Sequence, residues 1–346
     1  MTDINLKSKL FGAMNSYSGF RCNFDKIFNP ADYEKLYLLK GGPGTGKSSL
    51  MKKLSSYFDG KGYRISEIYC SSDTSSLDGL IIESALAKVG IFDATAPHEY
   101  DMKLPGAADE IINLGACWES CVLEMEREKI ERLTTVKKRH YRAAYSYLKL
   151  AGDFAAAEKE ILLKAFDKNA LLKNHAGLLP TTTVKGKRRE IPISAFCRDG
   201  YVIRDSFAPL FKGTISVSNK YGSGLIIMNT ILDWLSARST ELNYSPYVLN
   251  PEDCDCIFIH DSQTLIKISS GGIECLDCFN LNDDAIEELD RLEARRLEYE
   301  ELSKNELSAA SVAHFALEEI YTPSMDFGMV NKILERIIQK FESVLK

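Results

Sequence analysis

Short apolar runs alternate along the chain with stretches in which apolar residues recur every three or four positions. The run 36–39 predicts a buried strand, and the stretch 49–58 predicts an amphipathic helix. A second strand is expected to end in the polar cluster 70–73, and a further apolar run, 89–92, ends at Asp93. Strands that alternate with helices are typical of an α/β fold.

The same order of elements occurs again in the second half of the chain. A strand is predicted at 214–217 and a helix at 226–235, on either side of a glycine pair that matches the first half. Lys47 aligns with Leu225 at an offset of 225 − 47 = 178, and Asp78 aligns with Asp255 at 255 − 78 = 177. This nearly constant offset indicates a tandem duplication, and a chance likeness between two α/β segments is the alternative.

Each half ends in a long charged stretch with helical spacing, about 106–174 in the first and about 283–346 in the second. In the first stretch, helices at 118–150 and 154–174 are expected to form an αα-hairpin. The prolines and basic residues of 178–193 indicate a linker. We therefore expect two domains, 1–180 and 181–346, each with a helical appendage.

One eight-residue motif carries most of the chemistry. Residues 41–48 match G-x-x-x-x-G-K-[ST] and lie between a predicted strand and a predicted helix. In that setting backbone N–H groups and a helix N-terminus bind a phosphate chain, Lys47 reaches the terminal phosphates and Ser48 ligates Mg²⁺. A glycine-rich turn without a ligand is the alternative. The expected nucleotide contacts are Gly42, Pro43, Gly44, Thr45, Gly46, Lys47, Ser48 and Ser49.

This motif makes the expected fold more specific. Each half is predicted to be a P-loop NTPase-type α/β unit with a mainly parallel sheet flanked by helices. Polar residues at the carboxyl ends of such strands face the ligand. Asp73 and Glu83, which both follow apolar runs, are therefore weaker candidates for positioning water, substrate or metal.

Asp93 and His98 complete the candidate site. Asp93 ends its apolar run, as expected for a carboxylate that holds Mg²⁺ beside the loop strand. His98 lies in the loop that follows; it either senses the γ-phosphate or orients water, or it is an ordinary loop histidine. We expect Lys47, Asp93 and His98 to be catalytic, and Ser48 and Asp93 to be the metal ligands.

The second copy of the motif lacks these groups. Leu225 and Ile226 stand where the first copy has Lys47 and Ser48, and Ser270 stands opposite Asp93. An apolar pair cannot neutralise a nucleotide phosphate chain. The sequence therefore predicts one active nucleotide site and one degenerate pseudo-site.

Composition limits the other classes of function. The chain has 346 residues, 45% of them hydrophobic, and a formal net charge of −6, which disfavours broad binding to nucleic acid. The basic stretches 136–142 and 185–189, with Tyr141 and Tyr145 as stacking partners, keep that binding as an alternative to solvated surfaces. No apolar run is long enough to span a membrane and no signal peptide is recognised, so we expect a cytoplasmic protein.

The nine cysteines indicate reduced thiols, because their number is odd and they are scattered along a long chain. One subset has metal-ligand spacing, a C-x-C followed by a C-x-x-C. It would bind zinc if its two pairs met in space, and packed thiols are the alternative. The residues are Cys254, Cys256, Cys275 and Cys278.

The blocks 41–48, 70–73, 77–79, 93–98 and 105–115 together resemble a largely uncharacterised family of bacterial tandem P-loop ATPases. The resemblance covers the first half well and the second half in outline. It implies ATP binding and hydrolysis, but no particular substrate or pathway. Members of that family often carry a phosphate-binding loop in both halves, and this chain departs from the pattern at Leu225, Ile226 and Ser270.

The function expected is therefore Mg²⁺-dependent binding and hydrolysis of ATP in the first half. A nucleotide or small-molecule kinase and a non-enzymatic ATP-dependent switch or scaffold are the alternatives. The helical arms are candidate surfaces for a protein partner or a second copy of the chain. The arginine finger is unassigned, with Arg21, Arg198 and Arg204 as candidates.

Overall fold

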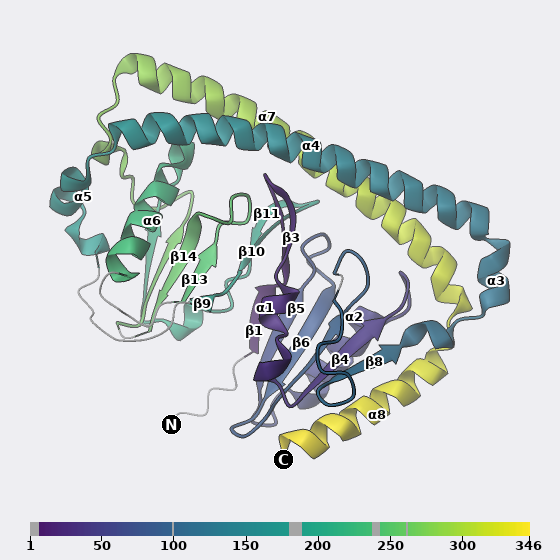
Figure 1. The fold of residues 1–346 in the computed structure, drawn as a ribbon. Coiled ribbons are helices and arrows are strands. Elements are labelled where there is room, and N and C mark those ends of the chain that lie inside the picture. The colour runs from purple at the N-terminus through teal and green to yellow at the C-terminus, as the bar shows by residue number, and fades with distance from the viewer. Residues whose placement is uncertain (1–6, 99, 180–188, 237–242, 261) are drawn as a thin grey trace.

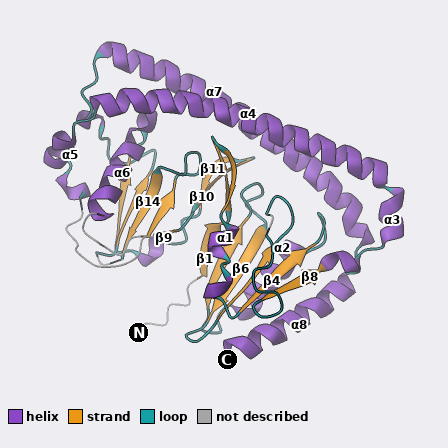
Figure 2. Ribbon diagram, viewed as in Figure 1, coloured by secondary structure: helices purple, strands orange, loops and turns teal. Residues whose placement is uncertain are grey.

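A computed structural model describes residues 7–98, 100–179, 189–236, 243–260 and 262–346. Two β-sheets lie side by side beneath an arch of two long helices, and the C-terminal helix ends on the side away from the arch (Figure 1). Helices cover the sheets, so the α/β class is confirmed (Figure 2). None of the helices in the described part of the chain is long and apolar enough to cross a membrane.

The first sheet has six strands in the order β1-β5-β6-β7-β4-β8. Only β6 runs against its neighbours, so the sheet is mixed where a mainly parallel one was expected. The strands are β1 (Lys7–Phe11), β4 (Lys35–Lys40), β5 (Arg64–Tyr69), β6 (Leu77–Glu83), β7 (Lys88–Asp93) and β8 (Asp109–Asn113).

Alternate residues of each strand face opposite sides of this sheet. Tyr37 and Leu39 of β4 pack beneath α2 (Lys47–Phe58), whereas Leu36 and Leu38 face the short helix α1 (Phe24–Ile27) and an aromatic cluster. Burial on both faces explains why β4 is an unbroken apolar run.

The second sheet repeats the pattern of the first. Its order is β12-β15-β14-β13-β9, and β14 is its only reversed strand. These strands match β4, β7, β6, β5 and β1 in both order and direction, and α6 (Ser223–Ser236) takes the place of α2. The strands are β9 (Arg189–Glu190), β12 (Gly213–Val217), β13 (Asn243–Pro246), β14 (Cys254–Ile259) and β15 (Thr264–Ile268).

A β-hairpin follows the first strand of each of these sheets. The first hairpin pairs β2 (Ala13–Ser16) with β3 (Gly19–Cys22), and the second pairs β10 (Ser194–Cys197) with β11 (Gly200–Ile203). The side chain of Asn15 donates a hydrogen bond to the Phe196 carbonyl at 2.8 Å, so the two hairpins meet between the sheets.

The arch consists of α4 (Arg127–Ala165) and α7 (Asp283–Tyr321), which run antiparallel along one another (Figure 1). The predicted αα-hairpin within the first half is therefore wrong, because α4 is one continuous helix. The helical part of the first half also begins later than residue 106, where it was predicted to begin. Residues 109–113 form β8, and a short helix, α3 (Ser120–Met125), leads into α4.

Buried charges join the two helices of the arch. Arg296 of α7 pairs with Glu158 of α4 at 2.7 Å and with Glu300 at 3.1 Å, and the Glu158 side chain is only 2% exposed. The buried guanidinium therefore neutralises carboxylates from both helices, which fixes their register.

Each half closes the core of the other half. The last helix, α8 (Phe327–Leu345), packs Val330, Ile337 and Phe341 onto the first sheet beside α2. In return, α5 (Lys168–Asn174) and the end of α4 pack onto the second sheet beside α6. Each half therefore contributes a helix to the core of the other half, and the domain boundary near residue 180 stays a prediction.

Candidate functional site

The loop between β4 and α2 has the backbone that its glycines predict. Gly44 and Gly46 have φ angles of 67° and 83°, a region that residues with a Cβ rarely adopt. The Thr45 hydroxyl donates to the Gly42 carbonyl at 2.8 Å and braces the turn. Gly46 then precedes the first turn of α2, whose free N–H groups form an anion-binding end.

Lys47 folds back over this loop. Its ammonium donates to the carbonyls of Gly41 and Gly42, both at 2.8 Å, and lies 3.5 Å from the Asp93 carboxylate. The Lys47 and Asp93 side chains are only 13% and 14% exposed. The two predicted catalytic charges are therefore together, and each neutralises the other.

Asp93 lies at the end of β7, directly beside β4, where its register partner is Leu39. One carboxylate oxygen accepts the Thr95 N–H at 2.9 Å and also the Thr95 hydroxyl. Burial raises the pKa of Asp93, and the nearby Lys47 opposes that rise. The other oxygen faces the loop lysine, and the metal-ligating role of Asp93 stays a prediction.

Ser48, the second residue of α2, is half-buried in the same site. Its hydroxyl oxygen accepts the Leu77 N–H at 2.9 Å, which leaves its own proton and one lone pair for other partners. Ser48 and Asp93 are the oxygen donors available here for Mg²⁺, an ion that prefers such ligands. Ser49, on the next position of α2, lines a cavity of about 280 Å³ between α2 and α8.

His98 is buried and makes an ion pair with Asp78 at 3.0 Å. Its ring stacks on Phe24 with a centroid distance of 4.6 Å. Burial lowers the pKa of His98, but the hydrogen bond with Asp78 outweighs it and raises the pKa to about 10. The histidine is thus a buried cation, and its predicted role at the γ-phosphate stays a prediction.

Sequence reasoning missed Asp78 because the direction of β6 was not predicted. Since β6 is antiparallel, its first residues lie at the same edge of the sheet as Asp93, and its last residue lies at the opposite edge. Glu83, a weaker candidate, is therefore at the wrong edge, where it pairs with Arg64 at 3.1 Å. The run of apolar residues after Asp78 is the signal that marked the strand.

The end of α7 covers the loop. A Cβ on Gly42 would lie 3.1 Å from the Tyr321 ring, and a Cβ on Gly44 would lie 2.7 Å from the Thr322 hydroxyl. The Gly44 N–H also interacts with the Glu318 carboxylate, whose pKa is lowered first by its hydrogen bond with His314. A carboxylate from the second half therefore lies against an N–H group of the predicted phosphate loop.

One pair of matching positions in the two arch helices carries opposite charges. Helices α4 and α7 each have 39 residues, and their starts differ by 283 − 127 = 156 positions, so Lys137 corresponds to Glu293 because 137 + 156 = 293. Lys137 is half-buried; burial, and then the ammonium groups of Lys138 and Lys47, lower its pKa. At the second loop, Glu293 instead accepts the Tyr221 N–H at 3.1 Å.

The second loop is closed by its own packing. Leu225 and Ile226 are 9% and 4% exposed and belong to the core of the second sheet. A Cβ on Gly224 would lie 2.3 Å from the Ser218 carbonyl oxygen. With apolar side chains in place of the lysine and serine, this loop lacks the ammonium and the hydroxyl that Lys47 and Ser48 supply, and its own Lys220 lies over the Tyr221 ring, 4.6 Å from the centroid.

The three candidate arginines have different surroundings. Arg198 pairs with Asp73 at 3.3 Å, across the contact between the two halves. Arg204 donates to the Thr74 carbonyl and stacks on the Tyr69 ring at 4.3 Å. Arg21 lies 3.7 Å from Glu190. Arg198 and Arg204 thus approach the loop that follows β5, and Arg21 pairs with the second sheet.

The structure also bears on two alternatives left open above, a zinc site at the four cysteines and a nucleic-acid surface at Tyr141 and Tyr145. Cys254 packs on one face of the second sheet and Cys256 on the other, so the four cysteines do not form one zinc site. Tyr141 and Tyr145 pack against the buried cluster beneath the arch, so they do not form an open stacking surface. The linker residues 185–188 lie outside the described residues.

Comparisons with protein families, curated proteins and solved structures found no match to this chain. The resemblance to tandem P-loop ATPases therefore stays a prediction from the residues that carry it.

Proposed function

We propose that the chain binds Mg-ATP at the 41–48 loop and hydrolyses it, with one site per chain. The observation that carries this proposal is the convergence of Lys47, Ser48 and Asp93 around a loop whose glycines have positive φ, at the start of a helix. An ammonium, a hydroxyl, a carboxylate and free N–H groups are the set that a magnesium–triphosphate needs.

In this proposal the groups change partners when the nucleotide binds. Lys47, which now donates to the carbonyls of Gly41 and Gly42, would hold the β- and γ-phosphates, and Asp93 would hold Mg²⁺, which would supply further neutralising charge. Lys137 then supplies a second cation from the arch. The mutual neutralisation of Lys47 and Asp93 would hold both charges in a buried place until the ligand arrives.

We also propose that both halves descend from one duplicated P-loop-type unit. The support is the identical order and direction of five strands in each sheet, together with the helix that follows β4 and β12. The second copy would have kept its fold and lost its ligand. The replacement of the lysine and serine by Leu225 and Ile226, which pack in the core of the second sheet, supports that loss.

Calorimetry with Mg-ATP tests the proposal directly. We expect one site in the unmodified chain, loss of binding in Lys47→Ala, and little change in Lys52→Ala, which removes an exposed lysine from the same helix. The rate of phosphate release should decrease in Lys47→Ala together with the affinity for Mg-ATP. Two equivalent sites, no site at all, or unchanged binding in Lys47→Ala would each refute it.

A nucleotide-dependent switch is the second candidate, and the cover over the loop favours it. Because Glu318, Tyr321 and Thr322 lie against the loop glycines, a bound triphosphate would displace the end of α7. Tight ATP binding without phosphate release, together with a nucleotide-dependent change in the arch, would favour the switch over the ATPase.

A further inference from the structure

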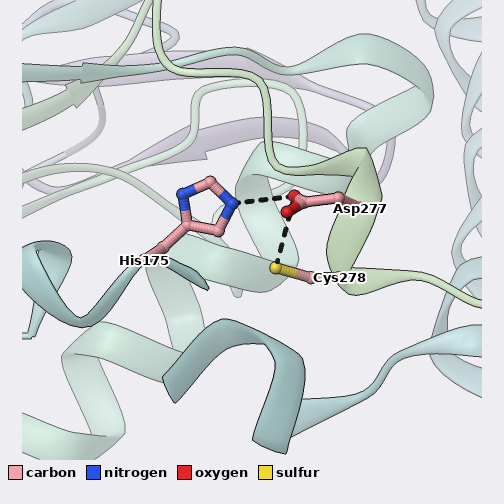
Figure 3. A group of neighbouring side chains, drawn as sticks. All are labelled: His175, Asp277 and Cys278. Carbon is pink, nitrogen blue, oxygen red and sulfur yellow. Dashed lines mark hydrogen bonds and ion pairs between the residues drawn. The ribbon is translucent and has the colours of Figure 1, made fainter. Parts of the chain in front are cut away.

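One cluster of chemically reactive side chains lies far from the loop, at the seam where α5 meets the second unit. His175 follows the last residue of α5, and Asp277 and Cys278 lie in the 3-10 turn Leu276–Cys278. The Nε2 of His175 is 2.7 Å from the Oδ1 of Asp277, and the Sγ of Cys278 is 3.8 Å from the same oxygen (Figure 3). All three ligand atoms lie within 4.8 Å of one another.

These three atoms are a nitrogen, an oxygen and a sulfur, the donor set that zinc takes. Four ligands at zinc distances of about 2.0–2.3 Å lie about 3.3–3.8 Å from one another in a tetrahedron. The distance from the Cys278 Sγ to the Asp277 Oδ1 is already in that range. The Nε2 of His175 would have to move away from the Asp277 Oδ1 by less than about 1 Å. Hard cations such as Mg²⁺ avoid thiolates, so zinc fits this set better.

The surroundings prepare the cluster for a cation. The Asn174 amide donates to the second Asp277 oxygen at 2.9 Å and orients the carboxylate, as groups behind metal ligands do. Cys278 is buried, and the His175 side chain is only 15% exposed. The side chains of His175, Asp277 and Cys278 are therefore held in place before any ion binds.

Cys275 lies at the C-x-x-C spacing from Cys278, is 1% exposed, and has its thiol 3.8 Å from the Ile273 carbonyl. A rotation about its χ1 bond would redirect this thiol.

We propose that His175, Asp277, Cys278 and Cys275 form a structural zinc site. The ion would join the end of α5, from the first half, to the turn that leads into α7. The same seam already contains the Asp167 N–H donating to the Cys278 carbonyl at 2.8 Å and the contact of Phe166 with Phe279. Zinc would therefore fasten the exchanged helix onto the second sheet.

Zinc content and cobalt substitution test this proposal on the full chain. The chain, purified under reducing conditions without a metal-affinity column, should hold about one zinc by mass spectrometry. Co²⁺ added to the metal-free chain should give intense tetrahedral ligand-field bands and a thiolate charge-transfer band. This spectrum reports sulfur ligation without any variant, so it remains informative if variants misfold.

Variants then assign the ligands. His175→Ala and Cys278→Ser should lose zinc, Asn174→Ala should raise the zinc Kd about 10–100-fold, and Cys121→Ser, an exposed thiol on α3, should retain one zinc. Failure of the unmodified chain to bind Zn²⁺ or Co²⁺ would refute the zinc site and leave the cluster as hydrogen-bonded side chains only. Full zinc in both ligand variants would also overturn the assignment.

Discussion

Replacing Glu318 by glutamine should strengthen ATP binding. In the free chain the Glu318 backbone packs against Gly44, and its carboxylate interacts with the Gly44 N–H, which the proposed nucleotide needs, so its negative charge would oppose the incoming phosphates. The glutamine keeps the length and the helix, but it removes the charge. The change therefore weakens a competitor of the ligand and leaves the loop glycines intact.

The size of the effect follows from the exposure of the group. A hydrogen bond to a charged group contributes about 1.5–3 kcal/mol. The Glu318 side chain is 40% exposed, so solvent screening reduces the value to about 1 kcal/mol. Because 1.4 kcal/mol corresponds to a tenfold change, we expect the Kd for Mg-ATP to fall about fivefold.

Calorimetry at constant ionic strength measures this change, and Glu319→Gln is the matched control. Glu319 is the next residue of α7 and is exposed, so its replacement alters net charge equally. An equal gain in both variants would show a general charge effect. A Kd in Glu318→Gln that is unchanged or weaker would refute the idea that α7 competes with the nucleotide.

Three further predictions follow from charges described above. Arg296→Met should lower the free energy of unfolding by about 3–5 kcal/mol, because it leaves a buried carboxylate of α4 unpaired. The control Arg295→Met, which replaces an exposed arginine, should lower it by less than about 1 kcal/mol. Urea unfolding measures both variants, and equal losses would contradict the buried pair. Lys137→Met should weaken Mg-ATP binding without lowering the melting temperature, and unchanged binding would remove Lys137 from the site. The ion pair with Asp78 raises the folded pKa of His98 to about 10, so the stability that the pair contributes should be complete below about pH 6.5 and should decline as pH rises toward 10. A His98→Gln variant should lack this decline. Parallel curves of unfolding free energy against pH for the two proteins would be evidence against the pair.

The sequence predicts the parts of this fold that depend on neighbouring residues. The strand 36–39, the glycine loop and the helix after it follow from local apolar spacing and from the positive φ of Gly44 and Gly46. Asp93 could be placed because an apolar run ends at it. These local signals also located the elements of the second half.

Features that depend on distant contacts were not predicted. The break expected between the helices 118–150 and 154–174 is absent, and Gly152 within that interval packs closely on Tyr17, because a Cβ there would lie 2.6 Å from the Tyr17 side chain. The glycine therefore allows a close contact inside α4 instead of ending the helix. The direction of β6 depends likewise on its partners β5 and β7, so Asp78 could not be placed beside Asp93 from sequence alone.

The reciprocal packing of α5 and α8 has a consequence for any attempt to divide the molecule. If the backbone were cut between the halves, each fragment would still carry a helix that belongs to the other fragment's interior. Apart, both fragments would expose broad apolar surfaces. We therefore expect a nicked chain to stay associated, and two co-expressed fragments to reassemble where either one alone would aggregate.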